Sequence, residues 1–238
     1  MAIEQNIGAQ EYFSSASNFA RLYVGAVEPQ YPISLWHDIP YYKGDTNMYQ
    51  GRVSYHGVVY DNVQLRFDQL EQRVVVLSPV GSVFCLPEQA YVDWFEMDGH
   101  RYVHDPEDST RYAALLCDGS TNGLRLFHSL WKVYSGEKFL FGEKKYLKTL
   151  STEEHYTLIT PDGEKHHVAR AKDIAKLFPE QKKQIKQFVR RNRLSFIKSE
   201  REKSLEKVVE SLEETHPQQT LPHPLPVEGG EKNDEFVN

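Results

Sequence analysis

Two histidines and three carboxylates fall within one short segment, in a pattern that could bind a divalent ion. They are His100, His104, Asp105, Glu107 and Asp108. Imidazole and carboxylate groups are common ligands of such ions, and histidines four residues apart share one face of a helix. Asp98 and Gly99, however, predict a tight turn into a strand, where positions i and i+4 lie about 13 Å apart. We therefore favour an exposed hairpin with an acidic loop and keep a metal site as the alternative.

Other candidate catalytic groups are weaker. His166 and His167 are adjacent, so they point to opposite faces of the strand that is expected there. Ser129, His128 and Asp118 have the side chains of a hydrolase triad, but their surroundings read as a strand with a core histidine. The sequence has no G-x-S-x-G, no glycine-rich phosphate loop and no H-E-x-x-H. We predict no catalytic, metal or cofactor site.

The two cysteines, Cys85 and Cys117, lie in apolar runs that resemble strands. Their spacing matches no zinc or redox motif. We expect two buried free thiols, with a disulfide between neighbouring strands as the alternative.

A basic segment stands out from an acidic chain. Between residues 172 and 201 there are ten Lys and Arg against three acidic residues, a balance of +7, so the rest of the chain carries −13. A solvated helix face explains this pattern most simply, and docking on an acidic partner or an anionic lipid surface is the functional alternative. Nucleic acid is less favoured, since the aromatic residues here fit a buried stripe. The predicted partner-binding residues are Lys182, Lys183, Lys186, Arg190, Arg191 and Arg193.

Residues 49–170 alternate apolar and polar positions, as expected for strands with one buried face. Turn signals such as His56-Gly57, Asp61-Asn62, Asp98-Gly99 and Ser135-Gly136 separate the runs. About ten short antiparallel strands result, and they predict a mainly β, α+β fold: a meander forming a sandwich or a barrel.

Residues 171–214 change to a helical period and predict two amphipathic helices packed on the sheet. The apolar stripes are Ile185, Phe188 and Val189, then Leu205, Val208, Val209 and Leu212. The expected end signals are Asp173 as a cap of a preceding short helix, Pro179 in a first turn, Asn192 as a stop, and Ser199 with Glu202 as a capping box.

The two ends of the chain read differently from the middle. Residues 1–48 are aromatic-rich and irregular, with a helical turn expected around residues 18–23, and residues 215–238 have the proline-rich, polar composition of a disordered tail. No run approaches the length of a membrane span, and Met1 is not followed by a signal segment. The hydrophobic content of 39% suffices for a sizeable core.

Several stretches together resemble a family of uncharacterised exported proteins of the Bacteroidota. They include "LYVGAVEPQY", "GRVSYHGVVYDNVQLRFDQLEQRVVVLS", "VDWFEMDGHRYV" and the basic C-terminal helices, and the resemblance covers most of Leu22 to Glu214. It implies export to the periplasm or cell surface, with the signal peptide absent from this chain. It implies no activity and no catalytic residues.

Three functions are compatible with these patterns. The first, which we favour, is a non-enzymatic interaction or scaffold protein that associates with a protein of a cell-envelope assembly. The second is a β-barrel holding an apolar or lipid-like molecule, unless its interior is filled by Trp94, Phe95, Phe127 and Trp131. The third is a metal-dependent hydrolase using His100, His104 and the nearby acidic residues.

Overall fold

One antiparallel sheet organises the chain in the computed structural model, which describes residues 21–28, 31, 38–79, 84–120, 123–143 and 145–213. In the described residues the sheet has eleven strands in the order β1-β5-β4-β3-β2-β6-β7-β8-β9-β10-β11. Apart from the placement of β1 and β5 at one edge and the step from β2 to β6, neighbours in sequence are neighbours in space. The predicted meander is therefore confirmed.

The strands have the following bounds: β1 Ala26–Val27, β2 Tyr49–Tyr55, β3 Val58–Asp68, β4 Arg73–Leu77, β5 Phe84–Leu86, β6 Val92–Met97, β7 His100–His104, β8 Tyr112–Cys117, β9 Arg125–Leu140, β10 Lys145–Ile159 and β11 Lys165–His167. The helices are α2 Ala171–Leu177, α3 Lys182–Arg191 and α4 Arg201–Glu213, with short 3-10 turns η1 Arg21–Tyr23, η2 Tyr42–Gly44, η3 Gln89–Tyr91 and η4 Pro179–Gln181. Strand β1 lies within the N-terminal segment that we predicted to be irregular. The predicted tail, 215–238, lies outside the described residues.

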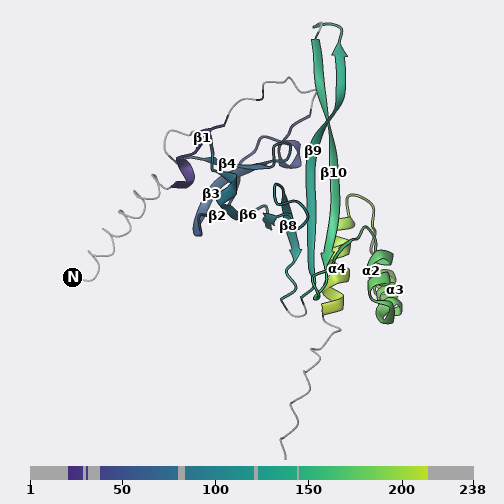
Figure 1. The fold of residues 1–238 in the computed structure, drawn as a ribbon. Coiled ribbons are helices and arrows are strands. Elements are labelled where there is room, and N and C mark those ends of the chain that lie inside the picture. The colour runs from purple at the N-terminus through teal and green to yellow at the C-terminus, as the bar shows by residue number, and fades with distance from the viewer. Residues whose placement is uncertain are drawn as a thin grey trace, which may run out of the picture.

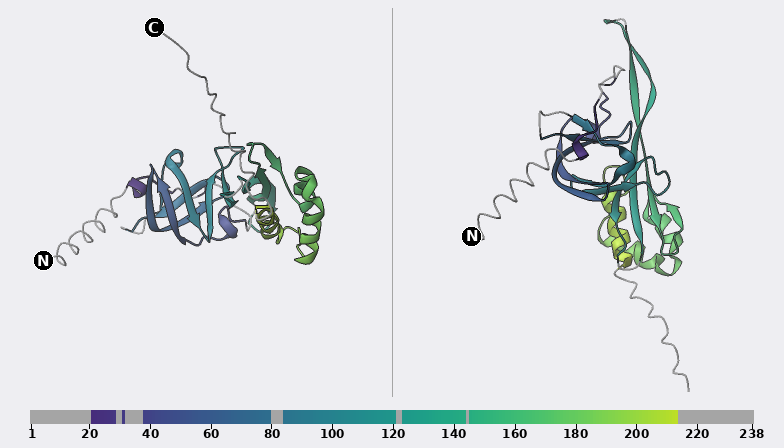
Figure 2. Two further views of the ribbon diagram at one scale, coloured as in Figure 1. Left: turned by 90° about the horizontal axis from the view of Figure 1, so that it is seen from below. Right: turned by 60° about the vertical axis from the view of Figure 1, so that its left-hand side comes forward.

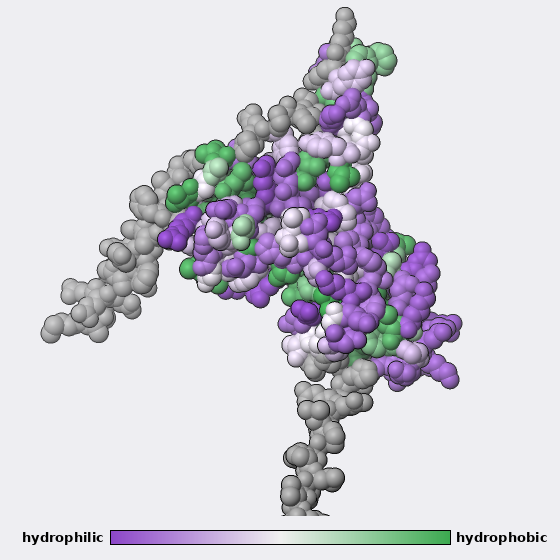
Figure 3. Space-filling model, in the orientation of Figure 1, coloured by the Kyte–Doolittle hydropathy of each residue, from purple (hydrophilic) through white to green (hydrophobic). Residues whose placement is uncertain are grey.

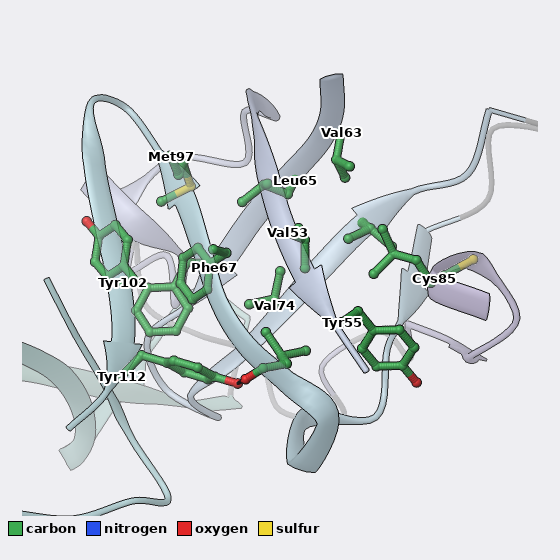
Figure 4. Packing of buried hydrophobic residues seen from close by; sticks show 14 of the residues in the cluster. Val53, Tyr55, Val63, Leu65, Phe67, Val74, Cys85, Met97, Tyr102 and Tyr112 are labelled. Carbon is green, nitrogen blue, oxygen red and sulfur yellow. Dashed lines mark hydrogen bonds between the residues drawn. The ribbon is translucent and has the colours of Figure 1, made fainter. Parts of the chain in front are cut away.

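The strands from β1 to β8 curl around an aromatic core (Figure 2, Figure 4). Phe95 is fully buried, and its ring stacks on Tyr102 with centroids 4.8 Å apart. Phe67 and Tyr112 pack against the same ring at 5.3 and 5.2 Å. The curled sheet does not close in the described residues, because β1 and β11 end the strand order. Rings in contact fill its interior, which weighs against a ligand-holding barrel.

The other aromatic residues that we considered as a possible filling of the interior lie elsewhere. Trp94 is half-buried on the outer face, between the guanidinium groups of Arg52 and Arg101. Trp131 is half-buried beneath Arg111, and Phe127 belongs to a separate small cluster. Of the four aromatic residues, only Phe95 belongs to the aromatic core, and alternation along β6 places Trp94 on the face opposite to it.

A second core joins the helices to the far end of the sheet. Leu205, Val208, Val209 and Leu212 of α4 are all buried, as predicted, and pack with Ile185 of α3 against the same face of β9 and β10 that carries Leu126 and Leu158. Phe188 and Val189 are partly buried against this cluster. Cys117 lies in this core and Cys85 in the aromatic one, and the two thiols form no disulfide.

Strands β9 and β10 form a long hairpin that extends far beyond its neighbours (Figure 1). Strand β8 pairs with β9 only as far as Ser129, and β11 pairs with β10 only from Thr157 to Ile159. We predicted that Ser135-Gly136 ends a strand, and this was wrong. The register shifts there, with Gly136 opposite Thr149 and Tyr134 opposite Leu150, so Ser135 is the extra residue of a bulge in one continuous strand.

Turn chemistry explains most of the other strand ends. His56-Gly57 and Asp98-Gly99 have positive φ at both positions, as a tight hairpin turn requires. Asp61-Asn62 is not a turn, because β3 runs through it with Asn62 at φ 56°. Here too a predicted turn is an irregularity within a strand.

The helix ends agree in part with the sequence signals. Asp173 caps α2 from its third position, where its carboxylate accepts hydrogen bonds from the backbone N–H groups of Ala169 and Arg170. Pro179 begins the short turn before α3, and Asn192 ends α3. The capping box at Ser199 was wrong. Helix α4 begins at Arg201, and the side chain of Glu202 binds a histidine of the sheet instead.

Candidate functional site

Helix α3 carries the predicted basic surface on its outer face. It begins after the turn that Pro179 starts and turns its apolar side, Ile185 with Phe188 and Val189, toward the second core. This leaves the polar side in solvent, and Lys182, Lys183, Lys186, Arg190, Arg191 and Arg193 are all exposed. Arg190 and Arg191 lie in the last turn, where cations complement the helix dipole.

None of these six cations forms an ion pair with a carboxylate in the described part of the chain. Some exposed cations elsewhere are paired: Lys43 with Asp98 at 2.6 Å, and Arg101 with Glu96 at 2.5 Å. Figure 3 shows this side of the molecule, at the lower right, as largely hydrophilic. The α3 surface, defined by the six cations, is therefore a concentration of positive charge without internal neutralisation.

A shallow hollow borders this surface where α3 meets α4. It has a volume of about 340 Å³ and is lined by Ile185, Phe188, Arg191 and Leu212, together with three glutamines and a serine. The lining combines apolar side chains with the cation of Arg191. This combination would suit a side chain of a partner protein.

The residues of the alternative metal site are dispersed by the fold. His100 points to α4, with its Nε2 3.7 Å from Glu202. His104 stacks on Tyr112, and its Nδ1 lies 3.0 Å from the carbonyl oxygen of Ser109. Asp108 binds Thr110 and Arg111 within its own loop. In the ranges that the structure describes, no group of three or more His, Cys, Asp or Glu is arranged to hold a metal ion.

Asp105 and Glu107 instead meet two histidines from the end of the sheet. His155 on β10 has its Nε2 3.7 Å from Asp105 and 3.9 Å from Glu107, and His167 on β11 lies 3.4 Å from Glu107. Asp105 also accepts the backbone N–H of Glu107, and Glu107 accepts the hydroxyl of Thr157 at 3.0 Å. These contacts hold the loop after β7 against β10 and β11. Sequence reasoning missed them, because the two acidic residues and His155 are some fifty residues apart.

Burial changes the pKa of His155, the histidine that lies beside Asp105 and Glu107. It lowers the pKa of His155 below its ordinary value, while Asp105 and Glu107 act in the opposite direction. Asp105 Oδ2 and His155 Nε2 are buried and have no hydrogen-bond partner in the described residues. The ring of His155 also makes an edge contact with Trp131 at 5.3 Å. The ring of His155 is thus a packed element of the structure.

Ser129, His128 and Asp118 form no triad, and the interpretation of this stretch as a strand with a partnered histidine is confirmed. His128 and Ser129 are adjacent on β9 and so face opposite sides of the sheet. His128 lies on the helix side, where its Nδ1 is 2.7 Å from Glu202 and its Nε2 is 3.5 Å from Glu154. Ser129 is buried on the other side. His166 and His167 likewise have separate partners, Glu164 and Glu107.

Comparisons with known proteins add no identification, since no family model, no curated protein and no solved structure matches the chain. Among the described helices, none combines the length and apolar character needed to cross a membrane. The α3 surface is therefore the candidate functional site on physical grounds.

Proposed function

We propose that this protein is a non-enzymatic binding protein that docks an acidic partner on the α3 surface. One observation carries the proposal: six exposed cations, five on α3 and Arg193 two residues beyond its end, lack a carboxylate partner within the described chain. Unpaired charge of one sign raises the rate of encounter with the opposite charge and favours complementary partners. The rest of the chain is acidic, so this surface is distinct from its surroundings.

The chemistry of the surface favours an acidic protein over nucleic acid. Single strands bind on exposed aromatic platforms, and Phe188 is packed against the second core. The hollow between α3 and α4 offers an apolar anchor point beside Arg191, as protein interfaces often do.

The location of the partner is part of the same proposal. The resemblance of the segments between Leu22 and Glu214 to exported proteins of the Bacteroidota favours a protein of a cell-envelope assembly, in the periplasm or at the cell surface.

The test is capture from envelope extracts with the tagged chain. Lys186→Glu/Arg190→Glu reverses two cations one turn apart on α3, and we expect it to weaken capture of the main partner by about tenfold or more. Raised salt should weaken the wild-type interaction.

The matched control is Lys203→Glu/Lys207→Glu, which makes the same charge change at the same spacing on the exposed side of α4. It should leave capture unchanged. The proposal fails if the wild-type chain captures nothing, or if both double variants lose the partner equally.

A further inference from the structure

The β9–β10 arm, residues 133–143 and 145–150, projects from the body of the molecule (Figure 1). Its base is fixed to the body: the backbone N–H of Lys132 donates to Gln69 at 2.8 Å, and that of Leu150 donates to the carboxylate of Asp38 at 2.9 Å. The ammonium group of Lys132 also donates to the carbonyl oxygens of Ile39 and Tyr41. Two views show the arm extending past every other element, with its end opposite to α3 (Figure 1, Figure 2).

The end of the arm exposes aromatic rings. Phe141 is 84% exposed and Tyr146 67%, and Phe139 lies between them at 39%. Ring centroids of Phe139 lie 5.0 Å from Phe141 and 4.9 Å from Tyr146, so the three rings form one apolar tip. These three rings remain exposed to solvent in the described fold. A group of exposed apolar side chains indicates an interaction site.

The amino-acid sequence of the arm is basic. Residues 135–150 contain four lysines and two glutamates, a balance of +2 in a chain that carries −6 overall. One glutamate, Glu137, is paired with Lys148 across the two strands. Aromatic rings flanked by lysines suit the headgroup region of an anionic bilayer, where rings enter the interface and ammonium groups meet phosphates.

The backbone of the arm also fits this environment. Pairing between β9 and β10 continues to Leu140 opposite Lys145, and the N–H of Glu143 donates to Leu140 within the turn. The inward N–H and C=O groups are thus satisfied without water up to the tip. The outward edges require water, so the tip can enter only the interfacial layer.

A partner protein is less well matched to the same tip. Addition of a partner strand is opposed by the bulge at Ser135 and by the charged side chains on the ribbon, which are usual protections of an open edge. A stable protein interface needs about 800 Å² from each side, contributed by about 20 or more residues, and the narrow end of a two-stranded ribbon offers fewer.

We propose that the apolar tip inserts Phe139, Phe141 and Tyr146 into the interface of an anionic phospholipid bilayer. The arm would then hold the body, with the α3 surface at its far end, at a fixed orientation to the membrane. This inference does not depend on the partner proposed for α3.

The experiment is flotation of the full chain with vesicles of phosphatidylcholine alone or mixed with phosphatidylglycerol. The wild-type chain should float with the mixed vesicles and do so less at high salt. Phe141→Ser/Tyr146→Ser should lower the partition coefficient by at least about tenfold, because it removes the two most exposed rings.

The matched control is Val58→Ser/Val59→Ser, which removes two exposed apolar side chains, 53% and 42% accessible, from another hairpin. It should float like the wild type, as should Lys186→Glu/Arg190→Glu. A Phe141→Trp variant should show a blue shift of the added emission with mixed vesicles, and quenching by brominated lipid.

Absence of flotation by the wild-type chain, or equal flotation of the tip variant, would overturn the proposal. So would a tip variant that floats normally but loses a protein from envelope extracts, since that result would assign the tip to a protein partner. Loss of the acidic partner by the α3 variant alone would leave this proposal intact.

Discussion

His128 on strand β9 and Glu202 in the first turn of α4 are joined by a hydrogen bond of 2.7 Å across 74 residues of sequence. The bond lowers the pKa of Glu202, although partial burial acts against this shift. Arg201, the preceding residue, binds Glu154 on β10 at 2.8 Å. These two contacts fix the start of α4 to neighbouring strands of the sheet.

Removal of this carboxylate should destabilise the protein. We expect Glu202→Ala to lower the free energy of unfolding by about 1–2 kcal/mol, because the His128 ring loses its charged acceptor. Urea denaturation measures the change. Glu210→Ala, on the exposed side of the same helix, should cost less than about 0.5 kcal/mol. A double-mutant cycle with His128→Gln that shows no coupling would contradict the assignment.

Stability should fall in mild acid through His155. Its folded-state pKa is below the unfolded value of 6.5, so the unfolded chain binds the proton at higher pH. The neutral form of His155 therefore contributes to the free energy of unfolding. This contribution is complete above pH 6.5 and is lost as the pH falls through the lower folded-state pKa. Urea denaturation between about pH 7.5 and about pH 5 should give a shallower pH dependence for His155→Gln than for the wild type. An equal pH dependence of stability for the wild type and His155→Gln would contradict this role of His155.

Adjacent residues on β6 should respond very differently to truncation. Phe95→Ala removes a fully buried ring that contacts three other aromatic rings, and should cost about 3–5 kcal/mol. Trp94→Ala removes a ring held between two arginines on the outer face and should cost less than about 2 kcal/mol. Thermal unfolding followed by near-ultraviolet dichroism would compare them, and the reverse order would refute the assigned faces.

The two cysteines should be unreactive in the folded protein. Burial raises the pKa of the Cys85 thiol, and both side chains are less than 8% exposed. Ellman's reagent should therefore detect two thiols in denaturant and react slowly without it. Immediate reaction under native conditions, or no thiols after unfolding, would contradict the structure.

The helices and most strands were predictable because each buries one face. The four apolar positions of α4 and the core residues Val53, Leu65 and Phe67 follow from local spacing alone. The basic character of α3 was equally visible, since its apolar stripe fixes which side remains in solvent.

The arm shows where local reading failed. Ser135-Gly136 has the composition of a turn, yet the opposite strand β10 pairs on both sides of it and makes it a bulge. Whether such a dipeptide turns the chain or only bends a strand depends on the partner strand. For the same reason, the exposed rings at residues 139, 141 and 146 were not recognised as one surface.

The amino-acid sequence by itself determined the periodic elements, their order and the charge of α3, because burial of one face acts over a few neighbouring residues. Only the tertiary structure decided that Asp105 and Glu107 meet His155 and His167, that His128 meets Glu202, and that β9 and β10 project as one arm. Those contacts depend on strand register and on how the sheet curls, which involve residues far apart in the chain.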